Sequence, residues 1–122
     1  MLKNRRAKGS TFEDIACAFL EKKGYQIIGR NVILLRRELD IVALDGETVV
    51  FVEVKGRHSL QYGSPAEAVD EKKRAGIARA AAAYLEQANL WDRPTRFDVV
   101  TIVADDDQGG IRIDHIMDAF RT

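Results

Sequence analysis

The chain of 122 residues is long enough for one domain with a real hydrophobic core, and 46% of its residues are hydrophobic. Its 19 lysines and arginines equal its 19 aspartates and glutamates, so the net charge does not indicate a nucleic-acid partner. Such a partner could be inferred only from local clusters of basic residues. Cys17 is the single cysteine, which excludes an internal disulfide and a cysteine metal site, and the lack of a run of about 18 apolar residues excludes a membrane-spanning helix.

Residues 1–9 are small and basic, and we expect them to form a mobile arm ahead of a single domain at residues 10–122. No apolar stretch follows this arm, so it is not a signal peptide, and the cytoplasm is the expected compartment. A first helix is predicted from Ser10 to about Lys23, with Ser10 and Glu13 spaced as a capping box. Glu13 lies at the edge of the apolar stripe, so it can serve either the cap or a site near the core.

A first strand is predicted at residues 25–35, with a break near Gly29, and two further apolar, β-branched runs follow it. The sequence Asp45-Gly46 between these runs predicts a tight type I′ hairpin. With Asp45 and Gly46 as the two turn residues, Asp40 would pair with Phe51. Glu38 would then stand opposite Glu53.

Alternation along this hairpin places Glu38, Asp40, Glu53 and Lys55 on one face, and an apolar set on the other face. The apolar set is Leu39, Ile41, Ala43, Val50, Val52 and Val54. Three crowded carboxylates repel one another, and a divalent cation such as Mg²⁺, which prefers hard oxygen ligands, would remove the conflict. The alternative is a solvated polar face with Lys55 as counter-ion, and a one-residue slip of the register would separate the charges.

A loop is predicted at residues 56–63, and Ser64, Pro65 and Glu67 then begin a second helix that runs to about Asn89. Its inner stripe is Ile77, Ala80, Ala81, Tyr84 and Leu85, and its first half is basic, with Lys72, Lys73, Arg74 and Arg79. A buried strand is predicted at residues 97–103, a turn at residues 105–110 and a short strand from Ile111. The fold class is therefore α/β, a mixed sheet flanked by helices in the order α-β-β-β-α-β-(β), with the second helix as a parallel crossover.

Asp40 followed by Glu53-Val54-Lys55 on the next strand resembles the PD-(D/E)XK nuclease signature of the restriction-endonuclease-like fold. From about residue 9 to residue 120 the chain resembles the YraN family of endonuclease-like bacterial proteins. The matching segments include Gly9 with Glu13 and Ala16, Gly24-Tyr25, Arg30-Asn31, Glu38-Leu39-Asp40, Phe51 to Lys55 with Arg57, Pro65, Glu67, Val69, Lys73, and Arg96 to Val100. Arg37 stands where a glycine usually precedes the Glu-x-Asp step, and no proline precedes Asp40, but neither departure removes a charged group.

The leading hypothesis is Mg²⁺- or Mn²⁺-dependent hydrolysis of phosphodiesters in nucleic acid, with DNA favoured over RNA. The sequence leaves open both the choice between DNA and RNA and the structure of the substrate, including branched DNA. Asp40 and Glu53 would hold the metal, Glu13 or Glu38 would act through water, and Lys55 would orient the attacking water. Contacts with the nucleic-acid backbone would come from Arg36, Arg37, Arg57, Lys72, Lys73 and Arg74. Two alternatives stay open: a module of the same fold that binds nucleic acid without cutting it, and a structural or partner-binding protein. The sequence leaves the oligomeric state open.

Overall fold

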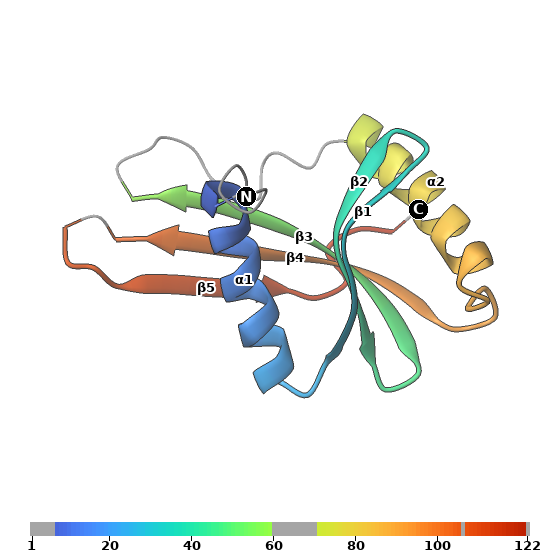
Figure 1. Cartoon of the computed structure of the whole chain (residues 1–122), viewed down its shortest axis with the longest axis horizontal. Coiled ribbons are helices and arrows are strands. Elements are labelled where there is room, and N and C mark those ends of the chain that lie inside the picture. Colours follow the sequence, from blue (N-terminus) through green and yellow to red (C-terminus); the bar gives the residue numbers. More distant parts are fainter. Residues whose placement is uncertain (1–6, 60–70, 106, 122) are drawn as a thin grey trace.

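The elements follow the predicted order in a computed structural model that describes residues 7–59, 71–105 and 107–121 (Figure 1). They are α1 (Ala7–Lys22), β1 (Gln26–Leu34), β2 (Arg37–Asp45), β3 (Thr48–His58), α2 (Glu71–Gln87), β4 (Thr95–Ala104) and β5 (Ile111–Ile116). The five strands form one sheet in the order β1-β2-β3-β4-β5, in which β3 and β4 are parallel and the other neighbours antiparallel. This confirms the α/β class, the mixed sheet and the parallel crossover through the second helix.

The hydrophobic core lies in two layers, one on each face of the sheet. The layer under α1 contains Ala16, Cys17, Leu20, Tyr25, Ile41, Ala43, Val50, Val52, Val100 and Ile102. The layer under α2 contains Leu39, Val42, Val49, Phe51, Ile77, Ala80, Ala81, Val99 and Phe120. The inner stripe predicted for the second helix is thus confirmed, and its small alanines allow the helix to approach the sheet closely.

Several predicted boundaries change or fall outside the described residues. The first helix begins at Ala7, so Ser10 lies within it and is not its cap, and residues 7–9 are helical. Residues 1–6 of the predicted arm and the predicted helix start at residues 64–67 lie outside the described residues. Among the described residues, no helix has the length and apolar character needed to cross a membrane.

The β2–β3 hairpin turns one residue later than predicted. Asp45 pairs with Thr48, so the two turn residues are Gly46 and Glu47. Of these two, Gly46 alone has a positive φ (61°), which is the pattern of a type II′ turn and not of the predicted type I′ turn. Gly at the first central position supplies that conformation without steric cost.

The later turn shifts the register of the hairpin by two residues. The predicted pairs Asp40–Phe51 and Glu38–Glu53 are therefore wrong, and the observed register, continued outward, places Asp40 opposite Glu53. Because side chains alternate with a period of two, an even shift leaves the facing of each strand unchanged. The predicted apolar face is therefore confirmed as far as the paired residues extend, with Ile41, Ala43, Val50 and Val52 in the layer under α1.

Beyond the Ile41–Val52 pair, β2 and β3 separate and the sheet forks, with β1 and β2 curling toward α2 and β3–β5 running the other way (Figure 1). At the fork the Asp40 carboxylate accepts a hydrogen bond from the backbone N–H of Val54 at 2.9 Å. This side-chain bond satisfies a donor that the separated strand no longer satisfies. The fork is the feature that positions the candidate site.

Leu39 is the apolar residue that departs from the predicted alternation. It was expected beside Ile41 and Ala43, but it is buried in the layer under α2. The reason is that β2 leaves β3 after Ile41 and turns with β1 toward α2, so strict alternation relative to β3 ends there. Leu39 thereby anchors the diverging arm of the fork.

Gly56 allows α1 to pack closely beside the site. A Cβ added at Gly56 would overlap the ring of Phe12, the residue that precedes Glu13 on α1. The absence of a side chain at this position on β3 therefore fixes how closely the Glu13 end of α1 approaches the sheet.

We expect Gly56→Ala to destabilise the protein by about 1–3 kcal/mol, because the added methyl forces the Phe12 ring or α1 to move. Urea unfolding measures the change. Gly110→Ala is the matched control, since a Cβ there meets nothing within 4 Å and should leave the stability nearly unchanged. Equal stability of the two variants would show that α1 is not held by this contact.

Candidate metal and nucleic-acid site

Three carboxylates converge at the fork of the sheet. Glu13 reaches it from α1, whereas Glu38 and Asp40 come from β2, and one oxygen of each lies within 4.8 Å of the others. Glu38 is exposed, and Glu13 and Asp40 are partly buried. The structure thus brings together three of the four carboxylates proposed as metal ligands from the sequence.

The electrostatic setting of Asp40 is unfavourable for a charged group. Burial is the largest cause that raises the pKa of Asp40, to about 7, and the neighbouring charge of Glu53 is the next. Glu13 and Glu38 raise the pKa further, while the hydrogen bond from the Val54 N–H opposes the shift. A carboxyl with this pKa holds a proton through much of the neutral range unless a cation takes its place.

Glu53 is buried on β3 and its carboxylate lies between two lysines. Oε1 of Glu53 is 3.8 Å from Lys55 Nζ and 3.6 Å from Lys73 Nζ, and Lys73 comes from α2. Burial, and then the Lys73 side chain, lower the pKa of Lys55 against the opposing effect of Glu53 and Asp40. The charge of Glu53 therefore raises the pKa of Asp40, but the Glu53 carboxylate is not one of the three that converge at the fork.

Arg30 on β1 is a charged neighbour that the site hypothesis did not include. Its guanidinium donates to Asp14 at 2.7 Å and lies 3.8 Å from Glu13. The pairing offsets part of the negative charge on α1. Arg30 and Asp14 could have been found only from the position of β1 beside α1, which the sequence pattern does not define.

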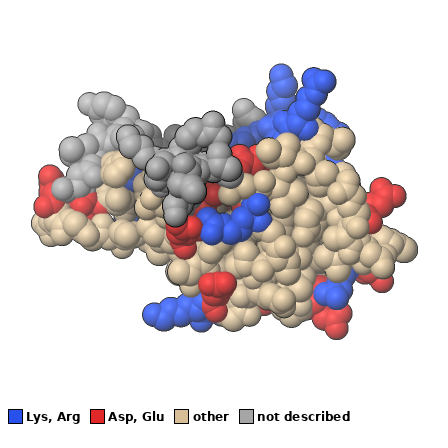
Figure 2. Space-filling view, viewed as in Figure 1, with Lys and Arg blue, Asp and Glu red and all other residues tan. Residues whose placement is uncertain are grey.

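The six basic residues proposed for backbone contacts do not form one patch. Lys73 reaches Glu53, Arg74 lies over the Phe120 ring at 5.4 Å, and Arg57 donates to the His58 carbonyl at 3.4 Å. Lys72 is exposed near the start of α2, and in Figure 2 basic side chains (blue) project from that edge of the molecule. Arg36 and Arg37 lie at the β1–β2 turn, where Arg36 is exposed and Arg37 covers Gly76 of α2.

Comparison with known proteins gives a family for this arrangement. Residues 12–102 match the profile of Uncharacterised protein family UPF0102. The chain belongs to the UPF0102 family. This confirms the resemblance to the YraN family, and the matched range contains the carboxylates and lysines of the fork.

Individual UPF0102 relatives match over most of their length. A UPF0102 protein of Pseudomonas paraeruginosa is 44% identical over 118 residues, covering 96% of this chain and 94% of the relative. One of Chlorobaculum tepidum is 46% identical, covering 92% of this chain and 90% of the relative. One of Carboxydothermus hydrogenoformans is 40% identical, with 86% and 89% covered. The domain described here therefore corresponds to nearly the whole of these UPF0102 proteins.

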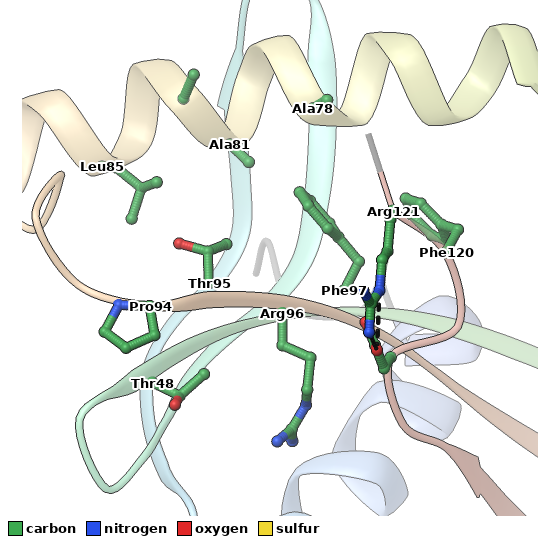
Figure 3. A pocket seen from close by; sticks show the side chains of 12 residues that line it. Thr48, Ala78, Ala81, Leu85, Pro94, Thr95, Arg96, Phe97, Phe120 and Arg121 are labelled. Atoms are coloured by element: carbon green, nitrogen blue, oxygen red, sulfur yellow. Dashed lines mark hydrogen bonds and ion pairs between the residues drawn. The ribbon is translucent and has the colours of Figure 1, made fainter.

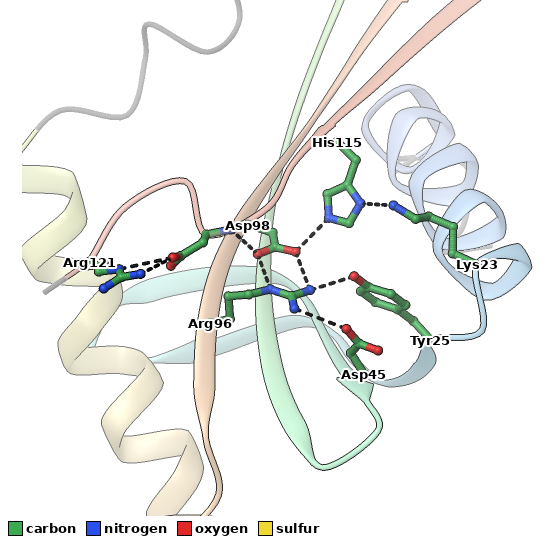
Figure 4. A network of polar contacts seen from close by, with 8 residues as sticks. Lys23, Tyr25, Asp45, Arg96, Asp98, His115 and Arg121 are labelled. Atoms are coloured by element: carbon green, nitrogen blue, oxygen red, sulfur yellow. Dashed lines mark hydrogen bonds and ion pairs between the residues drawn. The ribbon is translucent and has the colours of Figure 1, made fainter.

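A second polar cluster in this UPF0102 protein was not predicted, and it centres on Asp98 of β4 (Figure 4). Asp98 is fully buried, and its carboxylate accepts two hydrogen bonds from Arg96, at 2.9 and 3.0 Å, and one from the Asp118 N–H at 2.9 Å. His115 Nε2 lies 2.7 Å from the same carboxylate, and Lys23 Nζ lies 2.7 Å from His115 Nδ1. Because a lysine ammonium only donates, His115 accepts at Nδ1 and donates its Nε2 proton to Asp98.

This cluster joins parts of the chain that are distant in sequence. Arg96 also donates to the Tyr25 hydroxyl at 2.6 Å and to Asp45 at 3.2 Å. Burial acts to raise the pKa of Asp98, but the hydrogen bonds from Arg96, the Asp118 N–H and His115 outweigh it and lower that pKa. The cluster is therefore a charged structural centre beneath α1. The position of Asp98 within the buried strand predicted at residues 97–103 indicated that this carboxylate needs a polar partner, but it did not identify His115 or Lys23.

An open cavity of about 640 Å³ lies on the α2 side, between that helix, the start of β4 and the end of the described chain (Figure 3). Ala81, Leu85 and Phe97 form apolar walls, and Arg121 and Asp118 form an ion pair of 2.7 Å at its border. The Arg96 guanidinium points away from the α2 side of β4 in Figure 3 and belongs to the Asp98 cluster. None of the carboxylates of the fork lines the cavity.

Proposed function

We propose that this UPF0102 protein is a metal-dependent phosphodiester hydrolase that acts on nucleic acid, DNA rather than RNA, in the cytoplasm. The observation that carries the proposal is the convergence of Glu13, Glu38 and Asp40 at the fork, beside Lys55 and Lys73. Acidic ligands next to lysines are what cleavage of an anionic backbone requires, because the metal and the phosphate must both be held.

The donor set fits Mg²⁺ or Mn²⁺. Glu13, Glu38 and Asp40 offer hard carboxylate oxygens, and the pKa of Asp40 is raised first by burial and then by the neighbouring carboxylates, both of which a bound cation would offset. When bound, such an ion polarises the phosphate and lowers the pKa of a coordinated water. Glu53, the other proposed ligand, is occupied by Lys55 and Lys73 and would join this set only by leaving them.

The chain's own residues have distinct parts in this proposal. Lys55, whose pKa is lowered by burial and by Lys73, is neutral more often than an exposed lysine and can take a proton from the attacking water. Lys73 holds Glu53 and lies on α2, whose first turns carry Lys72 toward solvent. Exposed cations at this edge would contact backbone phosphates and position the strand without reading its sequence.

The alternative is a module of the same fold that binds nucleic acid without cutting it. One observation favours it: the carboxylate of Glu53 is paired with lysines and stands outside the group of three. Both functions predict binding that weakens steeply with salt, because phosphate contacts release counterions. Metal dependence of strand scission separates them.

The test uses the purified chain on linear, gapped and branched DNA and on matched RNA, with Mg²⁺, Mn²⁺ or EDTA. We expect strand scission with either metal, no scission in EDTA, and scission of DNA in preference to RNA. Lys55→Ala, purified in parallel, controls for contaminating nucleases and should lose cleavage while still binding DNA. Salt-sensitive binding without scission under any metal would replace the hydrolase by the binding module.

A further inference from the structure

The turn between β1 and β2 exposes aliphatic side chains where polar ones are usual. Ile33 and Leu35 are 70% and 65% exposed, compared with 52% for Ile111 on the opposite edge of the sheet. Two-residue hairpin turns with left-handed residues favour Asn and Gly. Here the two turn residues are Leu35 and Arg36, between the paired residues Leu34 and Arg37.

The backbone of this turn is strained by its own sequence. Leu35 and Arg36 have φ values of 53° and 62°, in the left-handed region that Gly or Asn adopts more cheaply. Burial does not explain the leucine, because its side chain lies in solvent. Gly or Asn would make this turn more stable, yet the sequence has leucine and arginine there. Backbone strain of this kind indicates that the side chain has a function.

The turn lies close to the carboxylates of the fork. Ile33 pairs with Glu38, so Leu35 is three residues along the hairpin from one of those carboxylates. At about 3.3 Å per residue, that separation is on the order of 10 Å. A base pair advances about 3.4 Å along duplex DNA, so the turn reaches bases within a few steps of a phosphate at the fork.

The charge around the turn suits a polyanion. Arg36 is exposed at the turn itself, and Arg37 lies against Gly76, which places the turn alongside the basic first half of α2 (Figure 1). Proteins that kink DNA insert an apolar side chain between base steps while nearby cations hold the backbone, and here Arg36 directly follows Leu35.

We propose that the β1–β2 turn is a wedge that inserts Leu35 between bases beside the phosphate held at the fork. This rests on the proposed function for the position of that phosphate. The substrate it favours is DNA with a weakened base step, such as an unpaired base, because separating bases that are already poorly stacked costs less. The exposed Arg36 holds a neighbouring phosphate.

The test measures base unstacking in EDTA, where no cleavage occurs. The probe is a DNA duplex with one bulged base and 2-aminopurine beside it, with the fully paired duplex for comparison. The wild-type chain should raise the 2-aminopurine fluorescence of the bulged duplex, and Leu35→Asn should lose most of that rise at saturating protein. Asn adopts the left-handed conformation readily, so this variant should melt no lower than the wild type. Ile111→Thr is the matched loss of an exposed aliphatic residue and should keep the full rise.

Three results would overturn the wedge: an equal rise with Leu35→Asn, failure of the wild type to bind the bulged duplex, or self-association in sedimentation that Leu35→Asn removes. Cleavage of the same DNA with Mn²⁺ is measured in parallel, so that failure of the wedge can be distinguished from failure of the proposed hydrolase. A Leu35-dependent rise without any cleavage supports the wedge and removes the hydrolase. Cleavage by the wild type and by Leu35→Asn at the same rate, with no change in fluorescence, removes the wedge and leaves the hydrolase.

Discussion

Asp40→Asn is expected to abolish metal-dependent cleavage and, in EDTA at pH 8, to raise the stability of the protein. Both effects have one cause, the negative charge concentrated at the fork of the sheet. Asn keeps the size of the side chain and an oxygen that can accept the Val54 N–H, but it removes the charge that faces Glu53, Glu13 and Glu38. A metal ligand is lost, and so is the repulsion within the apo protein.

The dependence of this effect on pH follows from the direction of the shift. Asp40 has a pKa of about 7 in the folded protein, above the value near 3.9 of an unfolded aspartate. The folded state therefore binds the proton more tightly, and the stability this provides is lost as the pH rises from about 4 through 7. The advantage of Asp40→Asn over the wild type should consequently grow by on the order of 2 kcal/mol between pH 5 and pH 8.

Urea unfolding at both pH values, in EDTA and in Mg²⁺, measures this prediction. Mg²⁺ should stabilise the wild type, by about 2.7 kcal/mol at a hundredfold excess over its Kd, and the variant much less. Asp114→Asn on β5 is the control, because Asp114 is exposed and its ion pair with Arg112 lies on the surface. An Asp40→Asn protein less stable than the wild type in EDTA, together with a wild type indifferent to Mg²⁺, would make Asp40 a structural residue.

Asp98→Asn should lower the free energy of unfolding by about 3 kcal/mol or more. Asp98 is fully buried and is the shared acceptor for Arg96, His115 and the Asp118 N–H. With an amide in its place, the Arg96 guanidinium loses its paired charge, and one of the two acceptor oxygens becomes a donor. The ion pair of Arg96 with Asp45 would remain, but Asp45 is partly exposed, so this pair would offset little of the lost stability.

The sign of the pH dependence is opposite to that of Asp40. The pKa of Asp98 is lowered in the folded protein, so its contribution to stability is present above about pH 4 and is lost as the pH falls. The deficit of Asp98→Asn should be full at pH 7 and should shrink in acid. Asp118→Asn is the control, since its ion pair with the exposed Arg121 is screened by solvent and Asn tolerates its φ of 54°. Similar losses in both variants would refute the central role of Asp98.

The faces of the hairpin could be predicted from sequence because they depend only on alternation. The turn was placed one residue early, but a shift of two residues preserves parity, so Ile41, Ala43, Val50 and Val52 still share one core layer. The stripe of Ile77, Ala80 and Ala81 was predicted for a similar reason, because helical periodicity does not require an exact start.

The fork and the Asp98 cluster could not be predicted from the same patterns. β2 separates from β3 because it stays paired with β1 and packs toward α2, which is a tertiary effect. This separation places Leu39 in the core layer under α2 and not in the layer predicted from alternation. Asp98 lies within an apolar strand, and its partners His115 and Lys23 belong to β5 and the end of α1. Nothing in their spacing links them until the strands are ordered.

The sequential strand order also determines how the chain must fold. Among the described strands, β1, β2 and β3 form a meander and β4 and β5 a hairpin, so most pairings close short loops. The parallel seam of β3 and β4 instead joins residues such as Phe51 and Phe97, which are far apart along the chain. Closing that long loop loses chain entropy before the contacts between β3 and β4 can form. We therefore expect the pairing of β3 with β4 to limit the folding rate. Glu53 lies on β3 opposite Val99 of β4, so we expect its ion pair with Lys73 of α2 to form only at this late step.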